Sequence, residues 1–341
     1  MMKKFILIVT MVPLSIFAQQ TTEYILYDGH NREYILYVPL SYSANDATPL
    51  LFAFHGGSGY ADDFMNFEAD FRPIADTVGF ILVYPQALAD PNDDGSTNWL
   101  HKDPTDHKDI FFVEALIDTI SSTYNIDNDR VYACGYSLGG MFSYELACSL
   151  NDRIAAISSV AGACFFGAFA NCNITHPTAV LTINGTNDGT HPYNDQNGWF
   201  FSVSAIDSFW ANTNNTDLTP IVTQIPDINS IDGSTVERYS WQNGDGCVSV
   251  EELKIINGGH DWPGTFGNMD IDASNETWRF VSKFNTSGLI NCSSTNIENQ
   301  QLVQDEKLVK RFNLLGKEVS NGSFVIDLFE NGNAKKIFIV K

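Results

Sequence analysis

The sequence predicts an α/β fold with a mostly parallel central sheet and helices on both faces, plus a small C-terminal β appendage. Three observations lead to this prediction. Continuous apolar runs of strand length recur through residues 49–256, and segments with a helical period lie between them. The charge balance then changes near the C-terminus. Because strands that alternate with helices form βαβ units, we expect a parallel sheet.

Composition indicates one large folded body and limits its partners. Of the 341 residues, 44% are hydrophobic and 18% charged, which is enough apolar content for a large core and too little charge for disorder. The net charge of −22 disfavours phosphate-rich ligands, so we expect no nucleic-acid partner. Residues 297–341 instead hold seven basic and six acidic residues, which marks a boundary before them.

The N-terminus has the pattern of a secretory signal peptide. Lys3 and Lys4 precede an apolar run from Phe5 to Phe17, and Ala18 offers a small residue for cleavage. The run is shorter than the ~20 apolar residues of a membrane-spanning helix. We therefore expect residues 1–18 to be removed near Ala18, no membrane span, and secretion to the extracellular space or the cell surface.

The elements of the body follow in chain order. Glu23–Tyr27 and Arg32–Val38 flank a turn at residues 28–31 and predict an antiparallel hairpin at one sheet edge. Buried strands are expected at residues 49–54, 80–84, 131–134, 155–160, 179–183 and 253–256. The clearest helix is expected to be capped by Asp109 and to bury one face made by Val113, Leu116, Ile117, Ile120 and Tyr124.

Six cysteines lie at positions 134, 148, 164, 172, 247 and 292. Their spacing fits no zinc site, and the sequence does not fix their connectivity. Cys134 lies in an apolar strand pattern and is expected to be a buried small hydrophobe. Cys148 ends a predicted helix and Cys172 precedes a predicted strand, so we expect these two to form a disulfide, which export would permit.

The end of the chain divides into a linker and a tail. Residues 288–301 lie in a stretch rich in Asn, Ser and Thr, and we expect them to link the large α/β body, residues 19–287, to a tail, residues 302–341. The tail reads as short strands separated by glycine turns. It resembles the C-terminal sorting tail of proteins exported by the type IX secretion system of Bacteroidetes, which implies the secretion machinery as a partner. An ordinary terminal hairpin is the alternative.

One motif indicates a catalytic serine. Gly135-Tyr-Ser137-Leu-Gly139-Gly140 follows the predicted strand 131–134 and opens a helix that runs to about Ser149. In that context, G-x-S-x-G is a nucleophile elbow, a turn so tight that only glycines fit beside the exposed serine. We therefore predict Ser137 to be a nucleophile.

A serine nucleophile needs a histidine base and an acid that orients it, and in this fold the chain order is Ser, acid, His. Asp188 follows the predicted strand 179–183, and His260 follows the strand 253–256. Both therefore fall at the carboxyl ends of strands, where active sites of open α/β sheets form. The sequence predicts a Ser137–Asp188–His260 triad.

Other assignments were weighed against this triad. His191 shares a loop with Asp188 and is the rival base, but the expected base follows the last strand. Asp261 adjoins His260 and is the rival acid, although side chains of adjacent loop residues rarely point at each other. Asn187 carries no charge, so it cannot serve as the acid. The remaining histidines are read as surface or turn residues, as is usual for lone histidines: His30, His101, His107 and His176.

The transition state of acyl transfer needs hydrogen-bond donors for its oxyanion. One is normally the backbone N–H of the residue after the nucleophile, here Leu138. The second is expected from the loop after an earlier strand, and His55-Gly-Gly-Ser-Gly59 stands directly after Phe54. Its glycines would let the backbone approach a substrate closely.

These motifs together resemble the secreted polyhydroxybutyrate depolymerase and feruloyl esterase group of α/β-hydrolases. The resemblance is carried by His55-Gly-Gly-Ser-Gly, Trp99, Gly135-Tyr-Ser-Leu-Gly-Gly, Gly185-Thr-Asn-Asp-Gly-Thr-His-Pro-Tyr193 and Gly259-His-Asp-Trp-Pro-Gly264. It covers residues 30–285 and implies an α/β-hydrolase fold. It also implies Ser137, Asp188 and His260 as triad, Gly57 and Leu138 as oxyanion donors, and Trp262 as a wall of the substrate cleft.

The substrate is less well determined than the reaction. Trp99 and Trp262 are expected to stack on a phenolic acyl group or a sugar face, or else to pack against neighbouring residues. Gly189-Thr-His191 replaces a stretch that is often more apolar in the family, which would reshape the substrate mouth. We therefore expect ester substrates, small or polymeric, of the feruloyl, acetyl or polyester type.

We expect no cofactor and no metal. Asp90-Pro-Asn-Asp-Asp-Gly95 begins like a calcium loop, but His101 stands where a bidentate glutamate is required, so a solvated acidic turn is favoured. The sequence therefore predicts a secreted serine carboxylic ester hydrolase that acts through an acyl-enzyme. The alternatives are a poly(3-hydroxybutyrate)-type polyester depolymerase and a non-catalytic secreted binding protein on a hydrolase fold.

Overall fold

The computed structural model describes residues 18–91, 93–99, 108–165, 169, 172–194, 198–292, 308–312, 324–329 and 334–338. The chain divides into two compact units, residues 1–292 and residues 293–341. The predicted signal peptide lies outside the described residues, apart from Ala18. Among the described residues, the helices are all too short or too polar to cross a bilayer.

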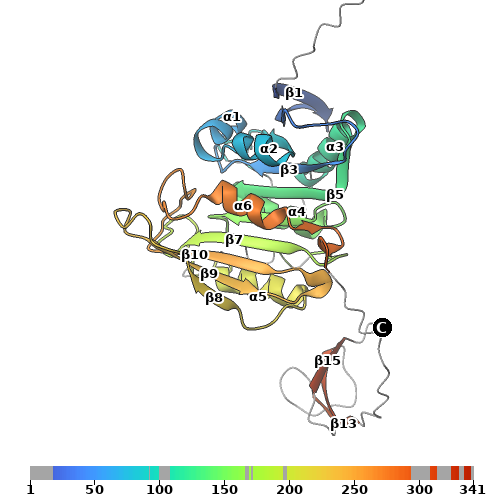
Figure 1. Ribbon diagram of the computed structural model, residues 1–341, viewed down its shortest axis with the longest axis vertical. Helices are drawn as coiled ribbons and strands as arrows, with labels where there is room; N and C mark the ends of the chain where they lie inside the picture. Colours follow the sequence, from blue (N-terminus) through green and yellow to red (C-terminus); the bar gives the residue numbers. More distant parts are fainter. Residues whose placement is uncertain are drawn as a thin grey trace, which may run out of the picture. The chain divides into compact units, whose positions relative to one another are not determined.

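A ten-stranded sheet forms the centre of the first unit, in the order β1-β2-β4-β3-β5-β6-β7-β10-β9-β8 (Figure 1). Its middle six strands run parallel. They are β4 (Ile81–Pro85), β3 (Thr48–Phe54), β5 (Ile126–Tyr136), β6 (Ala156–Val160), β7 (Ala179–Gly185) and β10 (Val250–Ile256). Each matches one of the six predicted buried runs, which confirms the mostly parallel sheet.

Antiparallel strands close both edges of the sheet. At one edge, β1 (Gln19–Tyr27) and β2 (His30–Val38) form the predicted hairpin, whose turn residues Asp28 and Gly29 have φ of 47° and 75°. Such positive values suit the two-residue turn of a hairpin. At the other edge, the antiparallel strands β8 (Ile221–Gln224) and β9 (Thr235–Trp241) were not predicted.

Helices cover both faces of the sheet. Successive strand residues point to opposite faces, so the apolar strands contribute to a hydrophobic core on each side. In β3, Phe52 and Phe54 belong to one core cluster, and Leu51 and Ala53 belong to the other. The first cluster is covered by α3 (Lys108–Thr123), α4 (Leu138–Ser149) and α5 (Val203–Thr213). The second is covered by α1 (Ala61–Asp63), a π-helical turn (Phe64–Glu68), α2 (Arg72–Val78) and α6 (Ala273–Val281), which crosses the front of the sheet in Figure 1.

Asp109 does not cap α3, which corrects the prediction. It lies inside the first turn of the helix and forms a buried ion pair with Arg32 of β2, with 2.7 Å between Nη2 and Oδ1. The guanidinium carbon of Arg32 lies 3.7 Å from the ring centre of Phe112, one turn further along α3. A carboxylate in a first helical turn is favourable whether or not it caps, so the sequence pattern fits both arrangements.

Two disulfides stabilise the first unit. Cys148 pairs with Cys172, as predicted, and Cys247 pairs with Cys292. Cys134 and Cys164 are free and buried. Disulfides form and persist in oxidising compartments, so these bonds are consistent with an extracellular location.

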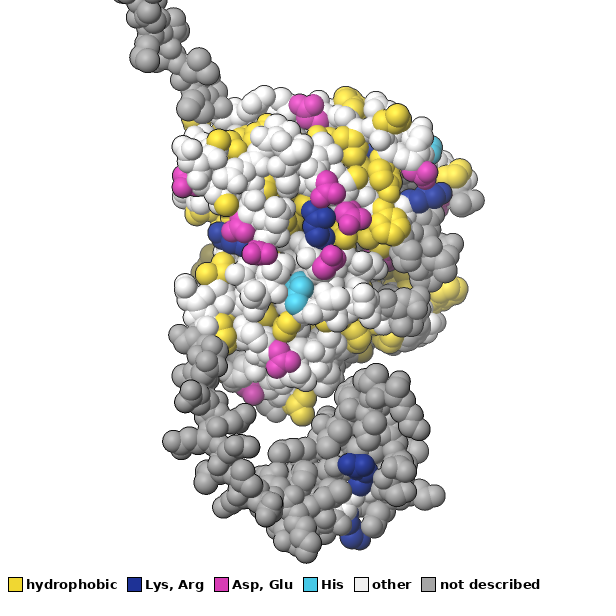
Figure 2. Space-filling view, turned by 90° about the vertical axis from the view of Figure 1, so that its right-hand side faces the viewer, with side chains coloured by type: hydrophobic (Ala, Val, Ile, Leu, Met, Phe, Trp, Pro, Cys, Tyr) yellow, Lys and Arg dark blue, Asp and Glu magenta, His cyan; other side chains and the backbone are white. Residues whose placement is uncertain are grey.

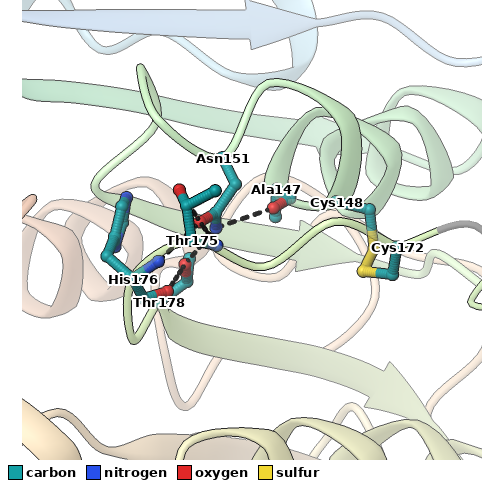
Figure 3. Close-up of a disulfide and its surroundings, with 7 residues drawn as sticks. All are labelled: Ala147, Cys148, Asn151, Cys172, Thr175, His176 and Thr178. Carbon is teal, nitrogen blue, oxygen red and sulfur yellow. Dashed lines mark hydrogen bonds between the residues drawn. A yellow bond between two sulfur atoms is a disulfide. The ribbon is translucent and has the colours of Figure 1, made fainter. Parts of the chain in front are cut away.

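The Cys148–Cys172 bond lies beside a turn that is organised by the buried side chain of Asn151 (Figure 3). Asn151 Nδ2 donates to Ala147 O (2.9 Å) and Thr178 Oγ1 (2.7 Å). Its Oδ1 accepts from the backbone N–H groups of Thr175 (2.7 Å) and His176 (2.9 Å). The disulfide and the hydrogen bonds of Asn151 therefore hold the segment that leads into β7 against the end of α4.

The first unit extends beyond the predicted end of the body at residue 287. β11 (Phe284–Asn285) and β12 (Gly288–Leu289) pair as a small hairpin, and the disulfide from Cys292 to Cys247 follows directly. Cys247 ends a 3-10 turn (Asp245–Cys247), which precedes β10. The first part of the predicted linker is therefore part of the folded body, and residues 293–300 lie outside the described residues.

The second unit contains a three-stranded antiparallel sheet in the order β13-β14-β15. These strands are Leu308–Phe312, Phe324–Phe329 and Ala334–Phe338, where the sequence predicts short strands. On the face of the first unit drawn in Figure 2, acidic side chains are scattered among hydrophobic and uncharged ones, with some basic side chains between them.

Candidate active site

Ser137 lies in the sharp turn between β5 and α4, with φ of 54° and ψ of −118°. A non-glycine residue at positive φ is strained and persists only where its surroundings enforce it. Here the neighbouring backbone does so. A Cβ on Gly135 would lie 2.4 Å from the carbonyl carbon of Gly139, and a Cβ on Gly139 would lie 2.1 Å from Phe54 O. Only glycine fits at either position, as a nucleophile elbow requires.

The structure brings the three predicted triad side chains together. His260 Nε2 lies 2.9 Å from Ser137 Oγ, and His260 Nδ1 lies 2.7 Å from Asp188 Oδ2. Ser137 follows β5, Asp188 follows β7 and His260 follows β10, all at the carboxyl ends of parallel strands. The same edge of the sheet therefore presents a continuous hydrogen-bonded chain from a hydroxyl through an imidazole to a carboxylate.

Asp188 is held in its ionised form. Burial opposes ionisation, but hydrogen bonds from His260 and from the backbone N–H groups of His191 and Thr190 outweigh it, and the pKa of Asp188 lies below its ordinary value of 3.8. Its Oδ1 accepts from both N–H groups at 2.8 Å, which leaves Oδ2 to His260. Because a carboxylate only accepts, His260 carries its proton on Nδ1 and presents the Nε2 lone pair to Ser137.

The loop after β3 lies against the elbow. A Cβ on Gly56 would lie 3.3 Å from Ser137 Cβ, and a Cβ on Gly57 would lie 2.6 Å from Leu138 Cδ1. Within the described part of the chain, the backbone N–H groups of Gly57 and Leu138 have no hydrogen-bond acceptor. The two predicted oxyanion donors are therefore neighbours beside the serine, and both are available.

His55 fixes the shape of this loop as a neutral residue. Its ring is 1% exposed, and burial lowers its pKa from 6.5 to about 4, against the opposing effect of the hydrogen bond to Gly56 O. Nδ1 donates to Gly56 O at 2.7 Å, and Nε2 accepts from the backbone N–H of Ala87 at 3.2 Å. Both ring nitrogens are used structurally, so His55 is not a rival catalytic base.

Neither Trp99 nor Trp262 can stack on a substrate, which corrects that prediction. Trp99 is fully buried, donates its Nε1–H to His55 O at 2.9 Å and stacks on Phe142 with ring centres 5.0 Å apart. Trp262 is 1% exposed and packs edge to face against Phe64 and Phe71. Both rings pack against core side chains, so they stabilise the loops that carry them and are not accessible to a substrate.

The structure gives contacts for His191, which the sequence offered as the rival base, and shows two aromatic residues that sequence reasoning missed. His191 is buried, and its ring centre lies 5.1 Å from that of His260 and 5.4 Å from that of Phe200. Next to Phe200 in the chain, the side chain of Trp199 is 69% exposed. Both residues follow the acid in the long connection after β7. Their position after Asp188 is the sequence feature that could have pointed to them as neighbours of the site. The sequence does not show, however, which aromatic residues of this connection are exposed.

The remaining weighed residues have other roles. Asp261 Oδ2 accepts from the backbone N–H of Gly259 at 2.9 Å rather than orienting His260. His30 is exposed, His176 bonds through Nδ1 to Pro177 O, and His101 and His107 lie outside the described residues.

The acidic turn that resembles a calcium loop is closed by backbone hydrogen bonds. Asp90 O accepts from the backbone N–H groups of Asp93 (3.2 Å) and Gly95 (3.0 Å). Over the described part of the chain, no group of three or more His, Cys, Asp or Glu side chains is arranged to hold a metal ion.

The chain is similar in sequence to known esterases. Residues 32–179 match the family model described as Esterase PHB depolymerase. The chain is 28% identical over 265 residues to a bifunctional acetylxylan esterase/xylanase from Neocallimastix patriciarum, a match that covers 78% of this chain and 35% of that protein. It is 26% identical over 260 residues to a probable feruloyl esterase C from Aspergillus niger, a match that covers 74% of this chain and 84% of that protein.

Solved structures show the same fold. An acetyl xylan esterase from Aspergillus awamori aligns with a TM-score of 0.55 at 17% identity and covers 78% of this chain and 98% of its own. A feruloyl esterase module from Clostridium thermocellum, solved with sinapinate, aligns with a TM-score of 0.50 at 14% identity and covers 79% of this chain and 91% of its own. The predicted α/β-hydrolase fold is thereby confirmed.

Proposed function

We propose that this chain is a carboxylic ester hydrolase, similar to the polyhydroxybutyrate depolymerases and feruloyl esterases, and that it works as a serine esterase with Ser137 as its nucleophile. The observation that carries the proposal is the hydrogen-bonded chain Ser137–His260–Asp188, with spacings of 2.9 Å and 2.7 Å. A non-catalytic relative would have no need to keep all three side chains in contact.

The mechanism follows from the donors and acceptors of this chain. His260 Nε2 accepts the proton of Ser137 as Oγ attacks the ester carbonyl, and the ionised Asp188 stabilises the imidazolium that forms. His260 then gives that proton to the oxygen of the departing alcohol, which leaves the acyl group on Ser137. A water molecule repeats the sequence in the second half-reaction and releases the acid.

The N–H groups of Leu138 and Gly57 are proposed to bind the oxyanion of each tetrahedral intermediate. Both are backbone groups in turns fixed by close contacts, so they need no reorganisation as charge develops on the substrate oxygen. Removal of one such donor typically slows turnover 10²–10³-fold. Backbone donors cannot be deleted by substitution, but displacing Gly57 by a larger residue would move one of them.

The proposed substrates are feruloyl, acetyl or polyester-type esters, because the similar proteins are named as acetylxylan and feruloyl esterases and the family model as a polyhydroxybutyrate depolymerase esterase. The last of these names supports the polyester depolymerase as the second candidate. Secretion through the signal peptide of residues 1–18, with export aided by the C-terminal tail, belongs to the same proposal. It is supported by the two disulfides.

The test compares hydrolysis of methyl ferulate, a short aryl acetate and hydroxybutyrate oligomers by the wild type and by Ser137→Ala. We expect turnover by the wild type and loss of at least 10⁴-fold in the variant. Preference for the ferulate or the acetate supports a cell-wall esterase, and preference for the oligomers supports the depolymerase. Equal hydrolysis by both proteins would refute Ser137 as the nucleophile.

A further inference from the structure

His191 is a second buried histidine beside the catalytic one. It lies three positions after Asp188, and its backbone N–H donates to Asp188 Oδ1 at 2.8 Å. Its ring stands nearly perpendicular to that of His260, at 86°, with 5.1 Å between ring centres. The proposed mechanism gives this imidazole no task, although it lies closer to the reacting groups than most side chains of the molecule.

The hydrogen bonding of His191 determines which ring nitrogen is free. Nδ1 lies 2.7 Å from Ala161 O, a carbonyl that can only accept, so Nδ1 carries the proton. Burial lowers the pKa of His191 below its ordinary value, against the opposing effect of this hydrogen bond, so the ring is neutral near pH 7. Nε2 is then a lone-pair acceptor. Within the described residues, Nε2 makes no hydrogen bond.

The order of strands places His191 on the side of Ser137 where an alcohol leaves. The oxyanion loop follows β3, Ser137 follows β5, Ala161 follows β6 and His191 follows β7, and these four strands are successive neighbours in the sheet. The substrate oxyanion therefore points towards β3, and His191 lies on the opposite side of the serine. The departing alcohol takes its proton from His260, whose ring His191 contacts.

We propose that His191 Nε2 accepts a hydrogen bond from a hydroxyl group on the alcohol part of the substrate, carried by the carbon next to the esterified one. This proposal rests on the serine-esterase function above. The alcohol oxygen must lie about 3 Å from His260 Nε2 and a neighbouring hydroxyl about 3 Å from that oxygen, and the ring of His191 lies 5.1 Å from that of His260, measured between ring centres. The substrate class is thereby narrowed to esters of carbohydrates and other vicinal polyols.

The surroundings of His191 suit such a group. Phe200 packs against the ring of His191, with ring centres 5.4 Å apart, and Phe165 stacks on Phe200 at 4.9 Å. An apolar wall beside one acceptor matches a sugar, whose ring carbons pack on aromatic faces while a hydroxyl donates. A hydroxybutyrate oligomer has no hydroxyl next to its ester oxygen, so the proposal also separates the two candidate substrate types.

The first test needs no variant. Wild-type enzyme is assayed on an acetylated methyl xyloside with a free neighbouring hydroxyl, on its deoxy analogue without that hydroxyl, and on cyclohexyl acetate. We expect kcat/KM to be about tenfold or more higher for the xyloside than for the deoxy analogue, because a buried acceptor is left unpaired by the analogue. Equal kcat/KM for the two xylosides would overturn the proposal while leaving the esterase function intact.

The second test uses His191→Phe, which keeps an aromatic ring and removes the acceptor, with His191→Gln as the conservative variant. We expect kcat/KM of His191→Phe to fall about tenfold further on the xyloside than on cyclohexyl acetate, and His191→Gln to recover part of that difference. Labelling of Ser137 by a fluorophosphonate reports whether each variant keeps a working triad. An equal loss on both substrates would show a structural role only, and failure of the wild type to hydrolyse any ester would instead refute the esterase function.

Discussion

Removal of the Cys148–Cys172 disulfide tests the account of how the site is supported. The bond closes a loop of 24 residues that contains β6 and the segment after it, including Ala161, to which His191 is tethered. Replacing both cysteines by alanine removes the cross-link without leaving a free thiol. The folded structure keeps the neighbouring turn at Asn151, so the unfolded chain is changed more than the native one.

The expected loss follows from the loop length. Chain-entropy arithmetic for a closure of 24 residues gives about 3.5 kcal/mol at 25 °C. The same arithmetic gives about 4 kcal/mol for the 45-residue closure between Cys247 and Cys292. For a body of this size, a loss of about 3.5 kcal/mol lowers Tm by roughly 10 °C.

The assay is urea unfolding followed by tryptophan fluorescence, at one protein concentration and without reductant. Cys164→Ala is the matched control, because Cys164 is free and buried and lines the same small cavity as Cys148. The free energy of unfolding of the double variant should lie about 3.5 kcal/mol below that of the control. A difference under about 0.5 kcal/mol, or alkylation of Cys148 in the unreduced, unfolded protein, would refute the reasoning.

Three further predictions concern the site. Asp188→Asn should lower kcat by about 10³–10⁴-fold, because an amide no longer fixes the tautomer of His260, and an unchanged steady-state rate would contradict its role. Burial lowers the pKa of His55 from 6.5 in the unfolded chain to about 4 in the folded protein. As the pH falls from 6.5 towards 4, the unfolded chain therefore binds a proton that the folded protein does not, and the free energy of unfolding falls by up to about 3 kcal/mol. His55→Gln should remove this part of the pH dependence. In denaturant unfolding at pH 7, 5.5 and 4, the difference in free energy of unfolding between the wild type and the variant should therefore shrink as the pH falls. A difference that stays constant would count against a buried neutral imidazole. Trp199→Ala should raise KM for aromatic or polymeric esters and change the free energy of unfolding by less than about 0.5 kcal/mol, because the ring is 69% exposed. Trp99→Ala should instead lower the free energy of unfolding by about 3–5 kcal/mol, because that ring is fully buried. The opposite ranking of the two variants by urea unfolding would refute this assignment of exposed and buried rings.

The central strands could be predicted because both of their faces are buried, which leaves continuous apolar runs in the sequence. β8 and β9 have no such signal. Every residue of the edge strand β8 is exposed, and its neighbour β9 mixes half-buried polar and apolar residues. Their pairing depends on β10, a contact between distant segments that local periodicity does not encode.

The contact between Ser137, His260 and Asp188 could be predicted because each residue follows a strand and the chemistry of a serine nucleophile fixes their order in the chain. The tryptophans could not be placed in the same way. Trp99 and Trp262 lie in loops that fold back into the core, and only the three-dimensional packing shows that their faces are covered. The ion pair of Arg32 with Asp109 and the contact of His191 with Ala161 likewise join residues far apart in the chain.

The most direct test of the central claim is labelling of the folded protein by a fluorophosphonate, with the modified peptide identified by mass spectrometry. The account predicts one label per chain, on Ser137, no label in Ser137→Ala and much slower labelling in His260→Ala, because only an activated hydroxyl attacks phosphorus at a useful rate. No labelling of the folded wild type, or a label on another residue, would contradict it.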